Sequence, residues 1–155
     1  PPPPPPPFQA EDGIRDMPTG LVGSEMCIRD SVYYEDTDAG GVVFYANYLA
    51  FMERARTEWL RELGYENSSL ATGPGVVFAV RRVEVDYLRP ARLDDVLDVT
   101  ASLTRISRAS LTFGQSVCLG SEVLCRASVQ LACVDSRNFR PTGIPRELLD
   151  RIKDE

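Results

Sequence analysis

The sequence predicts an α+β fold in which one long helix packs against an antiparallel sheet. Residues 47–63 carry apolar side chains at a helical period, whereas apolar and polar residues alternate in several runs after residue 77. Short turn sequences, Ser107-Arg108 and Gly120-Ser121, separate neighbouring runs and predict hairpins. A single helix leaves the edges of such a sheet open, which favours self-association.

The helix is expected to begin near Asn47 and to end before Gly64, because asparagine is a common N-cap and glycine commonly follows a helix. At about 1.5 Å per residue it is about 25 Å long, enough to cross several strands. Its apolar positions cover about half of the circumference, which predicts a deeply buried helix. These positions are Tyr48, Leu49, Phe51, Met52, Ala55, Trp59, Leu60 and Leu63.

About five strands are expected, one before the helix and four after it. Arg81-Arg82 interrupts the alternation in the second strand and predicts a β-bulge. Residues 65–77 have the composition of a loop, and Pro145 is expected to open a short helix over residues 146–153. The expected strands are 32–35, 78–87, 97–104, 109–119 and 123–133.

Composition excludes several classes of function. Histidine is absent, which removes every mechanism with a histidine base and every histidine metal site. The net charge of −6 disfavours nucleic acid as a partner, because phosphate binding requires a basic face. No apolar run is long enough for a membrane span and no secretory signal is evident, so a cytoplasmic location is expected. The four cysteines lack C-x-x-C spacing and are expected to be reduced thiols.

Residues 1–31 differ from the rest of the chain. Pro1 to Pro7 form a homopolymer, and the residues that follow have neither a helical nor a strand period. We therefore expect residues 1–31 to be a leader outside the fold, either a flexible tail or an artefact of gene prediction. Residues 32–155 are then expected to form one domain with its own core.

An acidic, glycine-rich loop precedes the helix and is the candidate site. It contains Asp36 and Asp38, followed by Gly40 and Gly41. A carboxylate opposite free N–H groups at a helix N-terminus is the arrangement that acyl transfer requires. The spacing alone favours a turn or capping aspartate, because loops of this type are common. A calcium loop is disfavoured, because Asn47 stands where such a loop needs glutamate.

Three segments together resemble a known family. They are Y-x-x-D-T-D-A-G-G-V-V-F-Y-A-N-Y-L, F-M-E-R-A-R-T-E-W-L and V-x-V-D-Y-L-R-P-A-R-L-D-D. They are similar to hotdog-fold acyl-CoA thioesterases of the YbgC and 4-hydroxybenzoyl-CoA thioesterase type, over about residues 32–145. The resemblance implies a hotdog fold, with a long central helix wrapped by a curved antiparallel sheet. It also implies homodimers with sites at the subunit boundary, often paired into homotetramers.

The resemblance assigns roles to individual residues. Asp38 matches the family's catalytic carboxylate, and Tyr45 matches the residue whose backbone N–H polarises the thioester carbonyl. The YbgC branch commonly has histidine at the position of Tyr45, so this chain follows the hydroxybenzoyl branch there. Apart from the resemblance, Asp36 is the second candidate for the catalytic carboxylate, and we expect it instead to be structural, through hydrogen bonds to loop amides. The expected substrate-binding residues are Gly40, Gly41, Asn47 and Tyr48.

The expected activity is hydrolysis of a short-chain or aromatic acyl-CoA to the free acid and CoA. Asp38 would act as nucleophile or general base, with helix N-terminal amides as the oxyanion hole. No metal or redox cofactor is expected, and acyl carrier protein is a further candidate partner. The alternative function is a non-catalytic acyl-binding or envelope-associated scaffold protein. Candidates for binding the CoA phosphates are Arg81, Arg82, Arg89, Arg92, Arg105 and Arg108.

Overall fold

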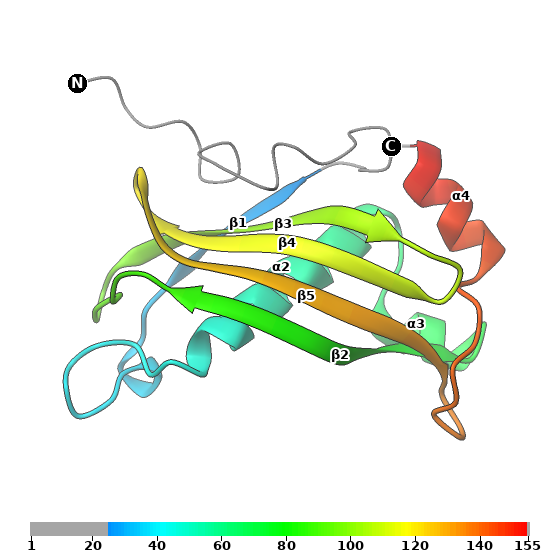
Figure 1. Cartoon of the computed structure of the whole chain (residues 1–155), viewed down its shortest axis with the longest axis horizontal. Helices are drawn as coiled ribbons and strands as arrows, with labels where there is room; N and C mark the ends of the chain where they lie inside the picture. The colour runs from blue at the N-terminus through cyan, green and yellow to red at the C-terminus, as the bar shows by residue number, and fades with distance from the viewer. Residues whose placement is uncertain (1–24, 155) are drawn as a thin grey trace.

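The computed structural model describes residues 25–154 as one antiparallel sheet with a long helix across one face (Figure 1). The strand order in the sheet is β1-β3-β4-β5-β2. No helix in residues 25–154 is long and apolar enough to cross a membrane. The strands are β1 (Met26–Ser31), β2 (Val76–Tyr87), β3 (Val96–Ile106), β4 (Ser110–Leu119) and β5 (Glu122–Asp135), and the helices are α2 (Asn47–Glu62), α3 (Asn67–Thr72) and α4 (Arg146–Asp154).

The alternating segments form the four later strands as predicted. The β3–β4 turn is closed by a hydrogen bond from Ser107 N to Ser110 O, and Gly120 turns the chain between β4 and β5 with a φ of +60°. Pairing between β2 and β5 shifts register between Val80 and Arg82, which confirms the predicted bulge. The bulge lies midway along β2, which is an edge strand of the sheet.

Helix α2 packs with its apolar side on β1, β3 and β4. Phe51, Met52 and Ala55 are fully buried against the inward side chains of the sheet. The Trp59 ring meets the Phe113 ring of β4 edge to face, with centroids 4.9 Å apart. The helix therefore covers the β1 side of the sheet and leaves the inner face near β2 less covered (Figure 1).

The structure corrects the predicted start of the domain. Strand β1 lies at Met26–Ser31, inside the predicted leader, and pairs with β3 from Met26↔Ala101 to Ser31↔Val96. The predicted strand at 32–35 is wrong, because the chain there turns into a short 3-10 helix, Tyr34–Asp36. The alternation of Met26 and Ile28 with Cys27 and Arg29 was the available signal. Residues 1–24, including the polyproline run, lie outside the described residues.

Two smaller predictions also change. The expected loop 65–77 contains α3, whose N-terminus is closed by Glu66 and Ser69 in a reciprocal capping arrangement. Gly64 follows α2 with a φ of +93°, as its predicted role requires. Asn47 is not the N-cap: Ala46 occupies that position, and Asn47 is the first helical residue.

Candidate active site at the start of helix α2

The acidic loop is tied down on both sides of its tip. Thr37 and Val43 form an isolated antiparallel bridge, and Phe44 N donates to Asp36 O over 2.9 Å. Val43 N also donates to Ala91 O, which anchors the returning strand of the loop to the segment before β3. Asp38 and the start of α2 are therefore held by the same short antiparallel ladder.

Asp36 is the structural carboxylate of the loop. Its side chain is buried, at 7% exposed. Oδ2 accepts a hydrogen bond from Tyr33 N over 2.9 Å, and Oδ1 accepts one from Asn47 Nδ2 over 2.8 Å. Both carboxylate oxygens are thus used within the fold, which agrees with the structural role expected of Asp36.

Asp38 stands in the opposite situation. It is exposed, and its Oδ1 accepts a hydrogen bond from Gly40 N over 2.8 Å. Its backbone N–H donates to Val42 O, and its carbonyl accepts from Gly41 N. Oδ2 has no partner among residues 25–154. One oxygen therefore holds the turn while the other is open to a water molecule or a substrate.

The two glycines meet different requirements. Gly41 has a φ of +79°, which side chains other than hydrogen disfavour, and open space surrounds the position of its missing Cβ. At Gly40 a Cβ would stand 3.3 Å from Asp38 Oδ1. Gly41 thus shapes the turn through its backbone, whereas Gly40 leaves room for the carboxylate.

Free N–H groups begin helix α2. The amides of Tyr45 and Ala46 donate to no backbone carbonyl of the described chain, and no side chain caps the helix. The helix dipole adds partial positive charge at the same place. Asn47, predicted to cap these amides, instead uses its side chain to hold Asp36. The uncapped helix start can therefore donate to an oxyanion.

Aromatic side chains surround the helix start. The Tyr45 ring is exposed and meets the Tyr87 ring of β2 edge to face, with centroids 6.2 Å apart. Tyr48, by contrast, is buried, and its hydroxyl accepts a hydrogen bond from Ala91 N over 3.0 Å. Burial raises the pKa of Tyr48. The structure thus gives Tyr48 a place in the core, whereas Tyr45 and Tyr87 form an exposed aromatic wall.

Three of the four cysteines are buried, and Cys27 is exposed. All four cysteines are free thiols. Burial raises the pKa of Cys118 and Cys125 to about 12 and that of Cys133 to about 11, so these thiols stay protonated at neutral pH. Across residues 25–154 no group of three or more acidic or cysteine side chains is placed to hold a metal ion. Asp38 is an exposed carboxylate in the loop that precedes the helix start.

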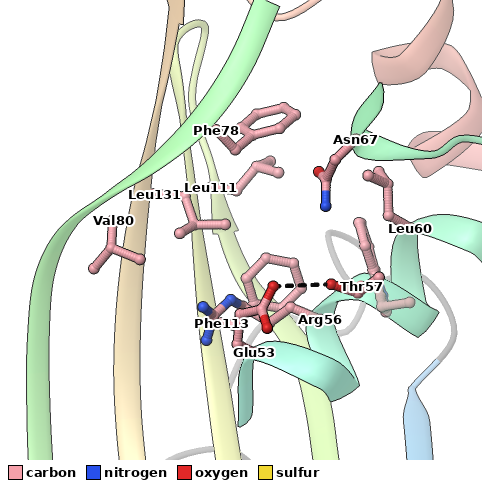
Figure 2. Close-up of a pocket in the computed structure, with 11 residues that line it drawn as sticks. Glu53, Arg56, Thr57, Leu60, Asn67, Phe78, Val80, Leu111, Phe113 and Leu131 are labelled. Carbon is pink, nitrogen blue, oxygen red and sulfur yellow. Dashed lines mark hydrogen bonds between the residues drawn. The ribbon is translucent and has the colours of Figure 1, made fainter. Parts of the chain in front are cut away.

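A separate pocket lies further along α2, between the helix and strands β2, β4 and β5. It has a volume of about 130 Å³. Figure 2 shows the side chains of Arg56 and Glu53 at one end and those of Phe78 and Asn67 at the other. None of the residues predicted to form the site lines this pocket.

The sequence prediction missed the pocket and its arginine. Arg56 follows Met52 by four positions and precedes Leu60 by four, so it falls within the apolar side of α2. Gln115 likewise occupies an inward position of β4, between Phe113 and Val117. A polar residue at an apolar position of each element was the signal that was available.

Comparison with known proteins identifies the family of this chain. Residues 40–129 match the family described as "Thioesterase superfamily". A Haemophilus influenzae protein named "Acyl-CoA thioesterase YbgC" is 42% identical over 117 residues, covering 76% of this chain and 86% of that protein. "Acyl-CoA thioester hydrolase YbgC" of Escherichia coli O157:H7 is 42% identical over 123 residues, covering 79% and 91%.

Solved structures have the same hotdog arrangement of sheet and helix. A probable thioesterase from Bartonella henselae superposes with a TM-score of 0.76 at 34% identity, covering 79% of this chain and 100% of that one. A 1,4-dihydroxy-2-naphthoyl-CoA thioesterase from Synechocystis superposes with a TM-score of 0.77 at 20% identity, covering 84% and 97%. The second likeness concerns the fold alone.

Proposed function

Because the chain belongs to the thioesterase superfamily and is a thioester hydrolase, we propose that it hydrolyses acyl-CoA with Asp38 as the catalytic carboxylate. The observation that carries this proposal is the contrast within one loop. The Asp36 carboxylate is fully used by the fold, whereas Asp38 keeps Oδ2 open in the loop that leads into a helix start with free N–H groups.

The proposed reaction has two possible first steps. As a general base, Asp38 takes a proton from water while the water oxygen attacks the thioester carbonyl. As a nucleophile, Asp38 attacks that carbonyl and forms an anhydride, which water then hydrolyses. In both routes the carbonyl oxygen becomes negative and accepts hydrogen bonds from the N–H groups at Tyr45 and Ala46. Collapse of this oxyanion breaks the C–S bond, which gives the free acid directly in the first route and the anhydride in the second, and CoA leaves as the thiol after gaining a proton.

Residues near Asp38 support the binding of an acyl-CoA substrate in this proposal. Gly40 and Gly41 allow the substrate to approach the loop backbone closely. The exposed rings of Tyr45 and Tyr87 offer apolar contact to a short or aromatic acyl group. An isolated bridge between Val42 and Arg92 places one of the candidate phosphate-binding arginines beside the loop.

We further propose that two copies join through β2, the longer edge strand of the sheet. An open edge presents unpaired N–H and C=O groups, and Val80, Tyr87 and Leu88 add exposed apolar surface there. A homotetramer of two such dimers is the larger assembly in this proposal. We also propose acyl carrier protein as a partner. A cytoplasmic location is proposed as well, in keeping with the four free thiols.

A thiol-release assay over short-chain, long-chain and aromatic acyl-CoAs tests the function. We expect turnover by the wild-type protein and loss of most of kcat in Asp38→Asn, with substrate binding retained. Glu35→Gln, which changes an exposed carboxylate in the same region, is the matched control and should keep full activity. Binding without turnover by the wild-type protein would instead support the scaffold alternative.

A further inference from the structure

Arg56 is held rigidly inside the pocket between α2 and the sheet. Its Nη1 donates to Gln115 Oε1 over 2.8 Å. Gln115 is fully buried, and its Nε2 donates to Met52 O over 2.9 Å and to Thr100 O over 3.1 Å. The amide is thereby fixed in one orientation, with its oxygen toward the guanidinium. Arg56 is consequently oriented by the core of the protein.

The guanidinium of Arg56 has no carboxylate partner in residues 25–154. The other arginines of α2 have one: Arg54 pairs with Asp30 and Arg61 with Glu58. Glu53 lines the same pocket, yet its carboxylate accepts from Thr57 Oγ1 and is not within 4.0 Å of the guanidinium. A guanidinium carries five N–H donors, and the fold uses one of them here. Arg56 is partly buried: burial lowers its pKa, and the nearby negative charge of Glu53 raises it. The N–H donors that the fold leaves unused favour an anionic ligand.

Besides Arg56, the polar residues of the pocket wall are Glu53, Thr57 and Asn67; the other lining residues are apolar, and the pocket's volume limits the size of the ligand. At about 130 Å³ the pocket is close to the roughly 150 Å³ of an engineered protein cavity that binds benzene. It therefore fits a short carbon chain or a single ring with a polar end. The apolar lining residues are Trp59, Leu60, Phe78, Leu111, Phe113 and Leu131.

We propose that this pocket binds the far end of an acyl group that terminates in a carboxylate, which Arg56 binds through paired N–H donors. The preferred substrates are then CoA thioesters of short dicarboxylic acids. This inference rests on the proposed function, because it names the substrate class of that reaction.

The pocket serves the catalytic loop of a second copy. Tyr45 and Arg56 of one chain are separated by about 16 Å along α2, beyond the reach of a short acyl group. Two β2 edges related by a two-fold axis pair antiparallel. If the two β2 strands pair about the bulge at Arg81, in the middle of each strand, then Tyr87 of one copy lies opposite the Val76 end of β2 in the other copy. The helix start beside Tyr87 then faces the partner's pocket, which Phe78 and Val80 line.

Two CoA thioesters of nearly equal shape test the inference on the wild-type protein. Succinyl-CoA ends in a carboxylate, and isocaproyl-CoA carries an uncharged isopropyl group in its place. We expect kcat/KM to be about tenfold or more higher for succinyl-CoA, the preference given by hydrogen bonds to a charged group. An equal or lower value for succinyl-CoA overturns the inference without use of a variant.

Substitutions on α2 then assign the preference to one side chain. Arg56→Met should reduce the succinyl-to-isocaproyl ratio of kcat/KM by about ten- to a hundredfold, mainly through KM, and Arg56→Lys should retain part of it. Arg54→Met is the matched control, because Arg54 pairs with Asp30 outside the pocket, and it should leave the ratio unchanged. An unchanged ratio in a folded Arg56→Met protein overturns the inference.

Three outcomes separate this inference from the proposals on which it rests. If Arg56→Met lowers activity on both thioesters equally and dissociates the oligomer, then Arg56 binds an acidic residue of the second copy, and the inference is wrong. If the wild-type protein cleaves no acyl-CoA at all, the proposed function itself fails. Turnover of uncharged thioesters without any preference for succinyl-CoA leaves the proposed function standing and removes only the substrate class.

Discussion

Asp36 and Asp38 lie two residues apart and have opposite environments. Asp36 is buried and bonds to Tyr33 and Asn47, which ties the loop to the helix. Asp38 is exposed, and its one side-chain hydrogen bond is to Gly40 within its own turn. The difference shows that a carboxylate is available for chemistry only where the fold leaves one of its oxygens without a hydrogen-bond partner. One aspartate builds the loop, and the other is presented by it.

The largest expected effect is the loss of activity in a variant of Asp38, because in this proposal Asp38, but not Asp36, supplies the catalytic carboxylate. Asp38→Ala should lower kcat by about 10²- to 10⁴-fold, the usual contribution of a general base, with little change in the free energy of unfolding. Steady-state thiol release and denaturant unfolding of the same preparation measure both quantities. If Asp38→Ala unfolds much more easily but retains its kcat, then Asp38 is a turn residue and the assignment is wrong.

The next effect should appear in stability. Asp36→Ala leaves the Tyr33 N–H and the Asn47 amide without an acceptor, at about 1–3 kcal/mol for each buried group left unpaired. We expect Asp36→Ala to lose about 2–4 kcal/mol in urea unfolding, measured against Glu35→Ala as an exposed control.

A double-mutant cycle with Asn47→Ala isolates the bond between the two side chains. The coupling energy should lie between about 0.5 and 3 kcal/mol. A coupling near zero would show that Asp36 stabilises the loop without Asn47.

The smallest effect distinguishes the adjacent glycines. Gly41→Ala should destabilise the protein by about 1–2 kcal/mol through its left-handed backbone alone, since the added methyl group meets no atom. Gly40→Ala introduces a contact 3.3 Å from Asp38 Oδ1 and should lower kcat more than it lowers stability. Parallel thermal melts and kinetics check this, and a larger loss of kcat in Gly41→Ala would contradict it.

Periodicity predicted the parts of the fold that bury one face. Alternation predicted the strands at 78–87 and 123–133, and its interruption predicted the bulge at Arg81. The helical period of the apolar residues predicted the long helix. Strand β1 was missed because six residues after an irregular leader give a weak pattern, and its partner β3 lies about seventy residues away in sequence. Tertiary pairing of that range is invisible to a local window.

The sequence offered a set of candidate site residues but not the contacts that they make. The loop motif placed Asp38 and Tyr45 beside the helix start, whereas local rules assigned Asn47 to capping. The side chain of Asn47 bonds to Asp36 instead, because the pairing of Thr37 with Val43 places Asp36 beside the first turn of the helix. The pocket around Arg56 depends on which strands lie opposite α2, which no motif in the sequence states.

The buried amide of Gln115 has a mechanical consequence. It joins a carbonyl in the middle of α2 to a carbonyl of β3, so the helix cannot slide or rotate along the sheet without stranding polar groups in the interior. A helix that packs only on aliphatic side chains has many positions along the sheet of nearly equal energy. The hydrogen bonds of Gln115 favour one of these positions, and this position sets the distance between the acidic loop and the side chains of the strands.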